Sequence, residues 1–207
     1  MERNLKIPKA VIKRLSLYSR ILQNLEIKNV QKVSSKELGE LLGVNSAQVR
    51  KDLAYFGQFG VPGFGYYVSE LRSEIKKILR TDRPIKIGLI GVGNLGTALL
   101  SYTGFKKQGF NIIAAFDNDK RKIGRRQNNV IIEDIENLEK IIREKEIEII
   151  ILTVPVEKAQ EITNKVLSAG ITTILNFVPT RLIVPDYVKV HYVDLSIEIE
   201  SLSFYVK

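Results

Sequence analysis

The residues with the clearest capacity for chemistry form a glycine-rich turn in the middle of the chain. An apolar stretch, Ile85–Ile90, leads into it, and a helical pattern follows it. In such a turn the first glycine allows a sharp bend, the second lets a pyrophosphate approach the backbone, and the third lets helix and strand pack closely. The helix N-terminus adds free amides and a positive dipole end. We therefore expect a dinucleotide at Gly91, Val92, Gly93, Asn94, Leu95 and Gly96.

A carboxylate for the adenosine ribose is expected at the end of the next strand. Asp117 lies 21 positions after Gly96 and follows the apolar stretch Asn111–Phe116. A carboxylate at this place accepts hydrogen bonds from a ribose and repels a 2′-phosphate, which favours NAD(H). Asp119 is the next acid. The cations Lys120–Lys122 keep NADP(H) open, and a plain turn residue is the structural alternative for Asp117.

Two further clusters are expected to line the nucleotide crevice. One ends the strand predicted over Ile147–Thr153, and the other follows the first helix, where aromatic rings could approach a nicotinamide. Packing between helix and sheet is an equally good interpretation of the rings. The residues concerned are Thr153, Val154, Pro155, Tyr102 and Phe105.

No residue stands out as the proton donor that hydride transfer would require. His191 is the only histidine, and it lies within the last expected strand, where a structural role is more common. A Tyr-x-x-x-Lys or Ser-x-x-x-Lys pair is missing from the expected strand ends. The sequence therefore predicts a cofactor site without a catalyst.

The positive charge is concentrated ahead of the glycine turn. The 207 residues carry a net charge of +9, and residues 1–80 hold 15 Lys and Arg against 7 Asp and Glu. Basic charge confined to one part of a chain indicates a polyanionic partner. The absence of cysteine excludes disulfides and thiol switches. Met1–Lys6 shows no apolar signal core and no stretch is long enough to span a membrane, so a cytoplasmic location is expected.

Residues 34–56 have the pattern of a helix-turn-helix. Ser34–Glu37 is a capping box, Gly43 ends the first short helix, and Asn45 or Ser46 caps the second. In the second helix Val49, Leu53 and Phe56 share the core-facing side. Small, amide and cationic residues occupy the outer face, as expected for a helix that contacts DNA. These are Ser46, Ala47, Gln48, Arg50, Lys51 and Ala54.

The segment that follows this helix predicts a wing. Phe56–Tyr67 is rich in glycine and aromatic residues, which suggests a hairpin with a tip along a minor groove. A three-helix packing module with solvated charges is the alternative. The residues here that we expect at DNA are Tyr55, Gly63, Gly65 and Tyr66.

The chain therefore predicts an α/β protein of two domains. Residues 1–80 form a winged helix-turn-helix domain, Thr81–Pro84 breaks the chain, and residues 85–193 form a Rossmann-like domain with a doubly wound parallel sheet. Helices are expected over Glu136–Lys145 and Glu157–Ala169. Strands are expected over Ile85–Ile90, Asn111–Phe116, Val130–Ile132, Ile147–Thr153, Ile171–Phe177 and Val188–Val193.

Both halves together resemble the Rex family of redox-sensing transcriptional repressors, essentially end to end. The resemblance rests on Gln48–Gly57, the Gly63-x-Gly65-Tyr66 wing, Gly91–Gly96 and Leu152–Pro155. It implies a homodimer, not an enzyme, that binds palindromic operator DNA when NADH is scarce and releases it when NADH binds.

The resemblance also implies roles outside these motifs. It implies a switch contact between subunits made by Arg20, Tyr102 and Asp194, and a helix exchanged between subunits within residues 194–207. By its own pattern, however, Asp194–Glu200 alternates at period two, which predicts a strand. Two rival interpretations remain: an NAD(P)-dependent dehydrogenase with a basic accessory domain, and a repressor whose ligand is coenzyme A.

Overall fold

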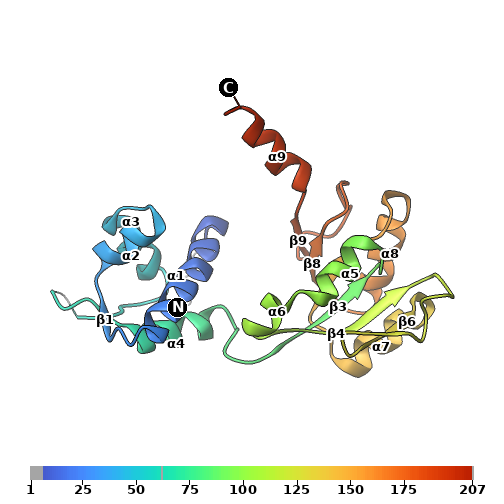
Figure 1. Ribbon diagram of the computed structural model, residues 1–207, viewed down its shortest axis with the longest axis horizontal. Helices are drawn as coiled ribbons and strands as arrows, with labels where there is room; N and C mark the ends of the chain where they lie inside the picture. Colours follow the sequence, from blue (N-terminus) through green and yellow to red (C-terminus); the bar gives the residue numbers. More distant parts are fainter. Residues whose placement is uncertain (1–6, 62, 207) are drawn as a thin grey trace. The chain divides into compact units, whose positions relative to one another are not determined.

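The computed structural model describes residues 7–61 and 63–206, which divide into two compact units, Met1–Arg83 and Pro84–Lys207 (Figure 1). Two parts of the sequence discussed above lie outside the described residues. They are Met1–Lys6, in which no apolar signal core is expected, and Pro62 of the expected wing. Within the described ranges no helix is long and apolar enough to cross a membrane.

In the described residues of the first unit, four helices accompany a short two-stranded ladder. The ladder pairs β1 (Lys32–Val33) with β2 (Tyr66–Tyr67) in antiparallel fashion. Its core is built from residues of all four helices, with Leu15, Tyr18 and Leu22 of the first helix fully buried. The helices are α1 (Lys9–Ile27), α2 (Ser35–Leu42), α3 (Ser46–Ala54) and α4 (Val68–Ile78).

The predicted helix-turn-helix boundaries are set by caps. The Ser34 hydroxyl accepts from the Glu37 amide, and the Glu37 carboxylate accepts from the Ser34 amide, so the capping box of α2 is complete. Gly43 ends α2 with φ of +72°, a left-handed conformation that glycine adopts without steric cost. The Asn45 side chain accepts from the Gln48 amide and begins α3.

Removal of the α2 cap has a modest expected effect. Ser34→Ala should lower the free energy of unfolding of the chain by about 1 kcal/mol, because one amide at the helix N-terminus loses its acceptor. Hydrogen bonds from Ser34 lower the pKa of Glu37 below its ordinary value of 4.5. The contribution of the Glu37 carboxylate to stability is therefore complete at pH values above 4.5, and it is lost as the pH falls through the folded pKa. Denaturant melts at pH 7 and pH 3 would measure this, with exposed Ser73→Ala as the control.

The wing differs from the hairpin expected over Phe56–Tyr67. Among the residues of the tip that the structure describes, a single bridge joins Val61 to Gly65, and Tyr66–Tyr67 pairs with Lys32–Val33 instead. The glycines between Gly57 and Gly65 all have positive φ, and such backbone does not continue a regular ladder. Burial of Tyr66 in the core draws β2 toward β1. The wing is therefore a glycine loop held at its base by β1.

The second unit confirms the predicted doubly wound fold. Its sheet has the order β5-β6-β4-β3-β7-β8-β9, parallel except for the pairing of β5 with β6. If β5 is set aside, the chain order across the sheet is that of dinucleotide-binding Rossmann folds. The strands are β3 (Ile85–Ile90), β4 (Phe110–Asp117), β5 (Arg126–Gln127), β6 (Val130–Asp134), β7 (Ile149–Leu152), β8 (Thr173–Asn176) and β9 (Lys189–Tyr192).

Helices cover both faces of this sheet. Ile90 packs into the core under α7 (Leu138–Lys145) and α8 (Val156–Ser168), and a short 3-10 turn, Ile135–Asn137, leads into α7. Its neighbour Leu89 packs into the core under α5 (Asn94–Ser101) and α6 (Thr103–Lys107). Because side chains alternate along a strand, a strand buried on both faces is apolar throughout.

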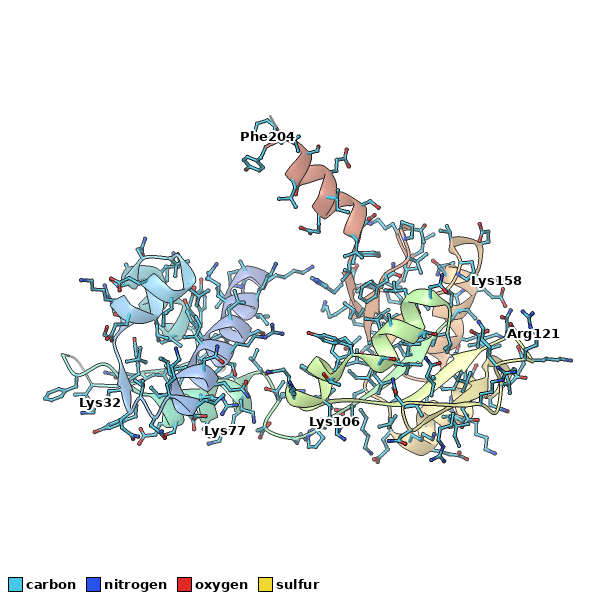
Figure 2. All side chains as sticks on the ribbon, viewed as in Figure 1. Lys32, Lys77, Lys106, Arg121, Lys158 and Phe204 are labelled. Carbon is cyan, nitrogen blue, oxygen red and sulfur yellow. The ribbon has the colours of Figure 1, made fainter. Side chains whose placement is uncertain are left out.

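The strand predicted over Asp194–Glu200 is wrong, since this segment is helix α9 (Leu195–Ser203). The Asp194 carboxylate accepts from the Ser196 amide and caps it. Leu195, Ile199 and Leu202 lie at helical spacing on one face, so the short alternating pattern is compatible with either period. These side chains are 59%, 69% and 64% exposed, and Figure 2 shows Phe204 at the end of α9.

Candidate nucleotide site and DNA-binding helix

The glycine turn lies at the point where the chain order of the sheet reverses, between β3 and β7. Gly91 has φ of +95°, and a Cβ there would meet the Thr153 carbonyl oxygen at 2.6 Å. A Cβ at Gly96 would lie 2.0 Å from the Gly91 carbonyl oxygen, so both glycines are required by close packing. A Cβ at Gly93 would meet nothing within 4 Å. The chain therefore needs no glycine at position 93 for its own packing, and the space there suits a ligand.

The N-terminus of α5 is open to a phosphate. Gly93 is its N-cap and has no side chain to accept from the first amides. Asn94 and Leu95 are exposed, whereas Val92 is buried. Helix N-termini leave their first amides unsatisfied, and these bind anions. The turn thus has the geometry that a pyrophosphate needs.

Asp117 ends β4 and fixes the glycine turn. Its carboxylate accepts from the Val92 amide (2.8 Å), the Asp119 amide (2.9 Å) and the Lys122 ammonium (2.9 Å). Burial alone would raise the pKa of Asp117, but these hydrogen bonds lower it below its ordinary value. The group is therefore an ionised acceptor at neutral pH. The sequence predicted the carboxylate but not its hold on Val92, which depends on how two strand ends meet.

Asp119 faces a different partner. Its carboxylate accepts from the Arg121 side chain at 2.8 and 2.9 Å and from the Arg121 amide at 3.0 Å. The hydrogen bond from the Arg121 side chain lowers the pKa of Asp119 well below its usual range. Each carboxylate is thus paired with one cation, Asp117 with Lys122 and Asp119 with Arg121. Lys122 therefore lies beside Asp117, the carboxylate expected to bind a ribose.

Thr153 ties β7 to the turn. Its amide donates to the Ile90 carbonyl oxygen (2.9 Å), and its hydroxyl lies 3.0 Å from that oxygen and 2.7 Å from the Gly91 oxygen. Val154 is half-buried and Pro155 is exposed just before α8. The hydroxyl of Thr153 therefore holds the backbone of the turn, a role that the sequence pattern did not indicate.

Tyr102 and Phe105 form an aromatic pair. Their rings meet edge to face with centroids 5.1 Å apart. Phe105 is half-buried against the core under α5, whereas Tyr102 is 60% exposed. A Cβ at Gly104 would lie 2.4 Å from the Tyr102 ring, so glycine at this place lets the ring lie over the backbone. Phe105 packs against this core, the exposed Tyr102 ring is free to meet a ligand or a partner, and a place for either ring beside a nicotinamide stays a prediction.

The outer face of α3 is polar and cationic. Ala47, Arg50 and Lys51 are exposed, and Ser46, Gln48 and Tyr55 are half-buried. The Arg50 guanidinium donates to the Ser35 hydroxyl at 3.0 Å, which orients it across the start of α2. A groove of about 450 Å³ lies between α3 and the wing. Gly63 and Gly65 line this groove, and Tyr66 is only 9% exposed, its ring packed in the core.

The sequence did not single out Asp52, which is fully buried beneath this face. Its carboxylate accepts from Arg14 at 2.6 and 2.8 Å, from Tyr18 at 3.0 Å and from Gln48 at 2.7 Å. Burial raises the pKa of Asp52, and the hydrogen bonds, led by that from Arg14, lower it overall. Asp52 lies three residues after Val49 and so shares the core-facing side of α3, and this spacing was the sequence signal for its burial. The four side chains join α1 to α3.

The residues implied in a switch lie in both units. Arg20 is exposed on α1, and Tyr102 and Asp194 belong to the second unit, where Asp194 caps α9. The contact implied between them involves a second subunit and stays a prediction.

Comparison with known proteins supports both units. Residues 6–54 match a family model described as "Putative DNA-binding protein N-terminus", and residues 82–180 match one described as "CoA binding domain". A redox-sensing transcriptional repressor Rex from Carboxydothermus hydrogenoformans is 48% identical over 98% of this chain and 97% of its own. Another from Syntrophobacter fumaroxidans is 46% identical over 97% and 96% of the two chains.

Solved structures give the same result. The crystal structure of RSP in complex with β-NAD+ and operator DNA matches with a TM-score of 0.91 and 41% identity, covering 96% of this chain and 92% of that one. RSP in complex with β-NADH matches with a TM-score of 0.87 and 39% identity over 98% and 95%. RSP is described as a Rex-family repressor. By full-length identity and by fold, the chain belongs to the Rex family of redox-sensing transcriptional repressors.

Proposed function

We propose that this chain is a repressor that senses the ratio of NADH to NAD+, binding palindromic operator DNA when NADH is low and dissociating when NADH binds. The observation that carries the proposal is the open cradle at Gly93 in the same chain as a helix-turn-helix with a cationic outer face. RSP, its full-length relative, has been crystallised with operator DNA and with both forms of the nucleotide.

The assignment of residues follows from the geometry. Gly91–Gly96 would hold the pyrophosphate against the N-terminus of α5, and Asp117 would accept from the adenosine ribose. Thr153, Val154 and Pro155 would line the crevice with the Tyr102 ring. NADH supplies a neutral nicotinamide ring and NAD+ a cationic one, and this difference is what the site must convert into a change of structure.

DNA would be bound by the first unit, residues 1–80 in our division of the chain. Arg50 has donors for a guanine edge, while Lys51 and Ser46 suit phosphates. The wing at Gly63 and Gly65 would lie along a minor groove. Tyr66, being buried, would support the wing instead of touching DNA.

A homodimer would be held by α9 of residues 194–207, whose apolar face is exposed in the single chain. Large exposed apolar patches mark association surfaces. We infer that this helix packs against a second copy, and that the cytoplasm is where the protein meets operator DNA and NADH.

Titration of operator complexes tests the function. Duplexes selected by the full chain from a palindromic library should be retained without nucleotide, released by NADH, and little affected by an equal concentration of NAD+. Retention irrespective of the coenzyme would overturn the proposal. Turnover of NADH with carbonyl substrates would instead favour a dehydrogenase, and release by coenzyme A but not NADH would favour the other rival ligand.

Asp194→Ala should uncouple the two activities. If Asp194 contributes to a contact with Arg20 and Tyr102, its removal should leave the Kd for NADH within about twofold and should weaken NADH-driven release, since coupling of this kind is worth about 1–3 kcal/mol. Asp194 also caps α9, so dimer mass must be checked by light scattering. Glu198→Ala, in the same helix, serves as the control. Normal release by the Asp194 variant would remove it from the switch.

A further inference from the structure

A hydrogen bond within α3 fixes the orientation of the Gln48 amide. Nε2 of Gln48 donates to Oδ1 of Asp52 at 2.7 Å. The same carboxylate is fully buried and receives two hydrogen bonds from Arg14. An ionised carboxylate can only accept hydrogen bonds. If the amide were flipped, Oε1 would face this carboxylate as a second acceptor, so the orientation follows from the chemistry of Asp52.

The other end of the amide is accessible. Throughout residues 7–61 and 63–206, Nε of Arg72 is the one buried side-chain polar atom without a hydrogen-bond partner. Gln48 is half-buried, and among these described residues no donor contacts its Oε1. Oε1 is therefore exposed to solvent. Gln48 is the third residue of α3, and its solvent-accessible carbonyl oxygen belongs to the helix that the helix-turn-helix offers to DNA.

We propose that Gln48 is a locked hydrogen-bond acceptor that reads an exocyclic amino group, adenine N6 or cytosine N4, on the major-groove edge of the operator. The proposal rests on the proposed function, because it requires α3 to enter the groove. In the major groove only adenine and cytosine present amino donors, whereas guanine O6 and thymine O4 are acceptors. Rotation of the amide that turned Oε1 away from this amino group would break the bond to Asp52, while the second Nε2–H stays available to a neighbouring acceptor such as adenine N7.

Arg50 supplies the opposite chemistry two residues later. Its guanidinium has only donors, one of which is directed at the Ser35 hydroxyl. Arg50 therefore suits the acceptor edge of guanine, and Gln48 suits an amino group. Two base pairs of each half-site should consequently show contrasting requirements, one for acceptors and one for an amino donor.

Deletion of single amino groups from the DNA provides the test. Duplexes selected by the full chain would carry purine in place of one adenine, or 2-pyrimidinone in place of one cytosine, at each position in turn. At one position per half-site we expect the wild-type Kd, measured by fluorescence anisotropy, to rise roughly 5- to 30-fold. The adenine and cytosine series identify which base is read.

Gln48→Leu shows whether Gln48 is the reader. This variant should bind the natural and the amino-deleted duplex equally at that position. Lys51→Ala is the matched control on the same helix, and it should weaken binding to every duplex alike while keeping the amino-group requirement. Melting curves establish that both variants fold, and the deletions on wild-type protein test the requirement without any variant.

The outcomes separate this inference from the function beneath it. If wild-type protein binds its duplex and no amino deletion matters, the inference fails while the repressor function stands. The inference also fails if Gln48→Leu keeps the wild-type penalty, because another residue is then the reader. If the wild type binds no duplex at all, the proposed function fails and the inference with it.

Discussion

Gly93→Ala is expected to weaken dinucleotide binding while leaving the free protein as stable as the wild type. The backbone at Gly93 has φ of −80°, which alanine adopts freely, and the added methyl group would meet nothing within 4 Å. A pyrophosphate seated on the turn would have to occupy that space. Overpacking of this kind costs about 1–3 kcal/mol, or roughly 5- to 150-fold in Kd. Calorimetric titration with NADH would measure the loss.

Gly96→Ala is the matched contrast. Its methyl group would lie 2.0 Å from the Gly91 carbonyl oxygen and 3.2 Å from the Leu89 side chain. Backbone atoms of the turn must move to admit it, so the melting temperature should fall even without nucleotide. Gly93→Ala should still bind operator DNA, because the first unit is untouched. Since the variant binds NADH more weakly, its operator complexes should need more NADH for release. NADH affinity equal to that of the wild type in Gly93→Ala would remove the pyrophosphate from this turn.

The second unit was largely predictable because its signals are local. The strand Ile85–Ile90 has the predicted bounds, since all its residues except Lys86 are apolar, as expected for a strand buried on both faces. The spacing of its glycines predicts the turn that follows this strand. The predicted strand Ile147–Thr153 is shorter in the structure, Ile149–Leu152. Ile147 and Thr153 at its ends are β-branched, and pattern alone does not separate them from the ladder.

What the sequence missed depends on tertiary contacts. The pairing of Tyr66–Tyr67 with Lys32–Val33 joins segments on either side of the helix-turn-helix, and no local pattern encodes it. The period of Asp194–Glu200 is ambiguous over so few residues, and the Asp194 cap favours the helix. The roles of Thr153 and Asp52 arise only when distant elements meet. The candidate site was thus predictable in its motifs and not in the contacts that hold them.

Asp52→Ala is expected to cause a large loss of stability in the first unit. The substitution removes the acceptor of four hydrogen bonds, two from Arg14 and one each from Tyr18 and Gln48. Removal of one partner from a buried ion pair typically costs 3–5 kcal/mol. The Arg14 side chain is 23% exposed and can regain some water, so about 3 kcal/mol is expected. That is a large share of the stability of a small domain.

Tyr18→Phe separates the carboxylate from the packing around it. It removes one hydrogen bond to Asp52 and keeps the ring in the core, so about 1 kcal/mol should be lost. Urea melts followed by circular dichroism would compare both variants with the wild type. Because the hydrogen bonds hold the pKa of Asp52 below its ordinary value of 3.8, its contribution is complete at neutral pH and is lost as the pH falls through the folded pKa. An Asp52 variant as stable as Tyr18→Phe would show that packing, and not this carboxylate, joins α1 to α3.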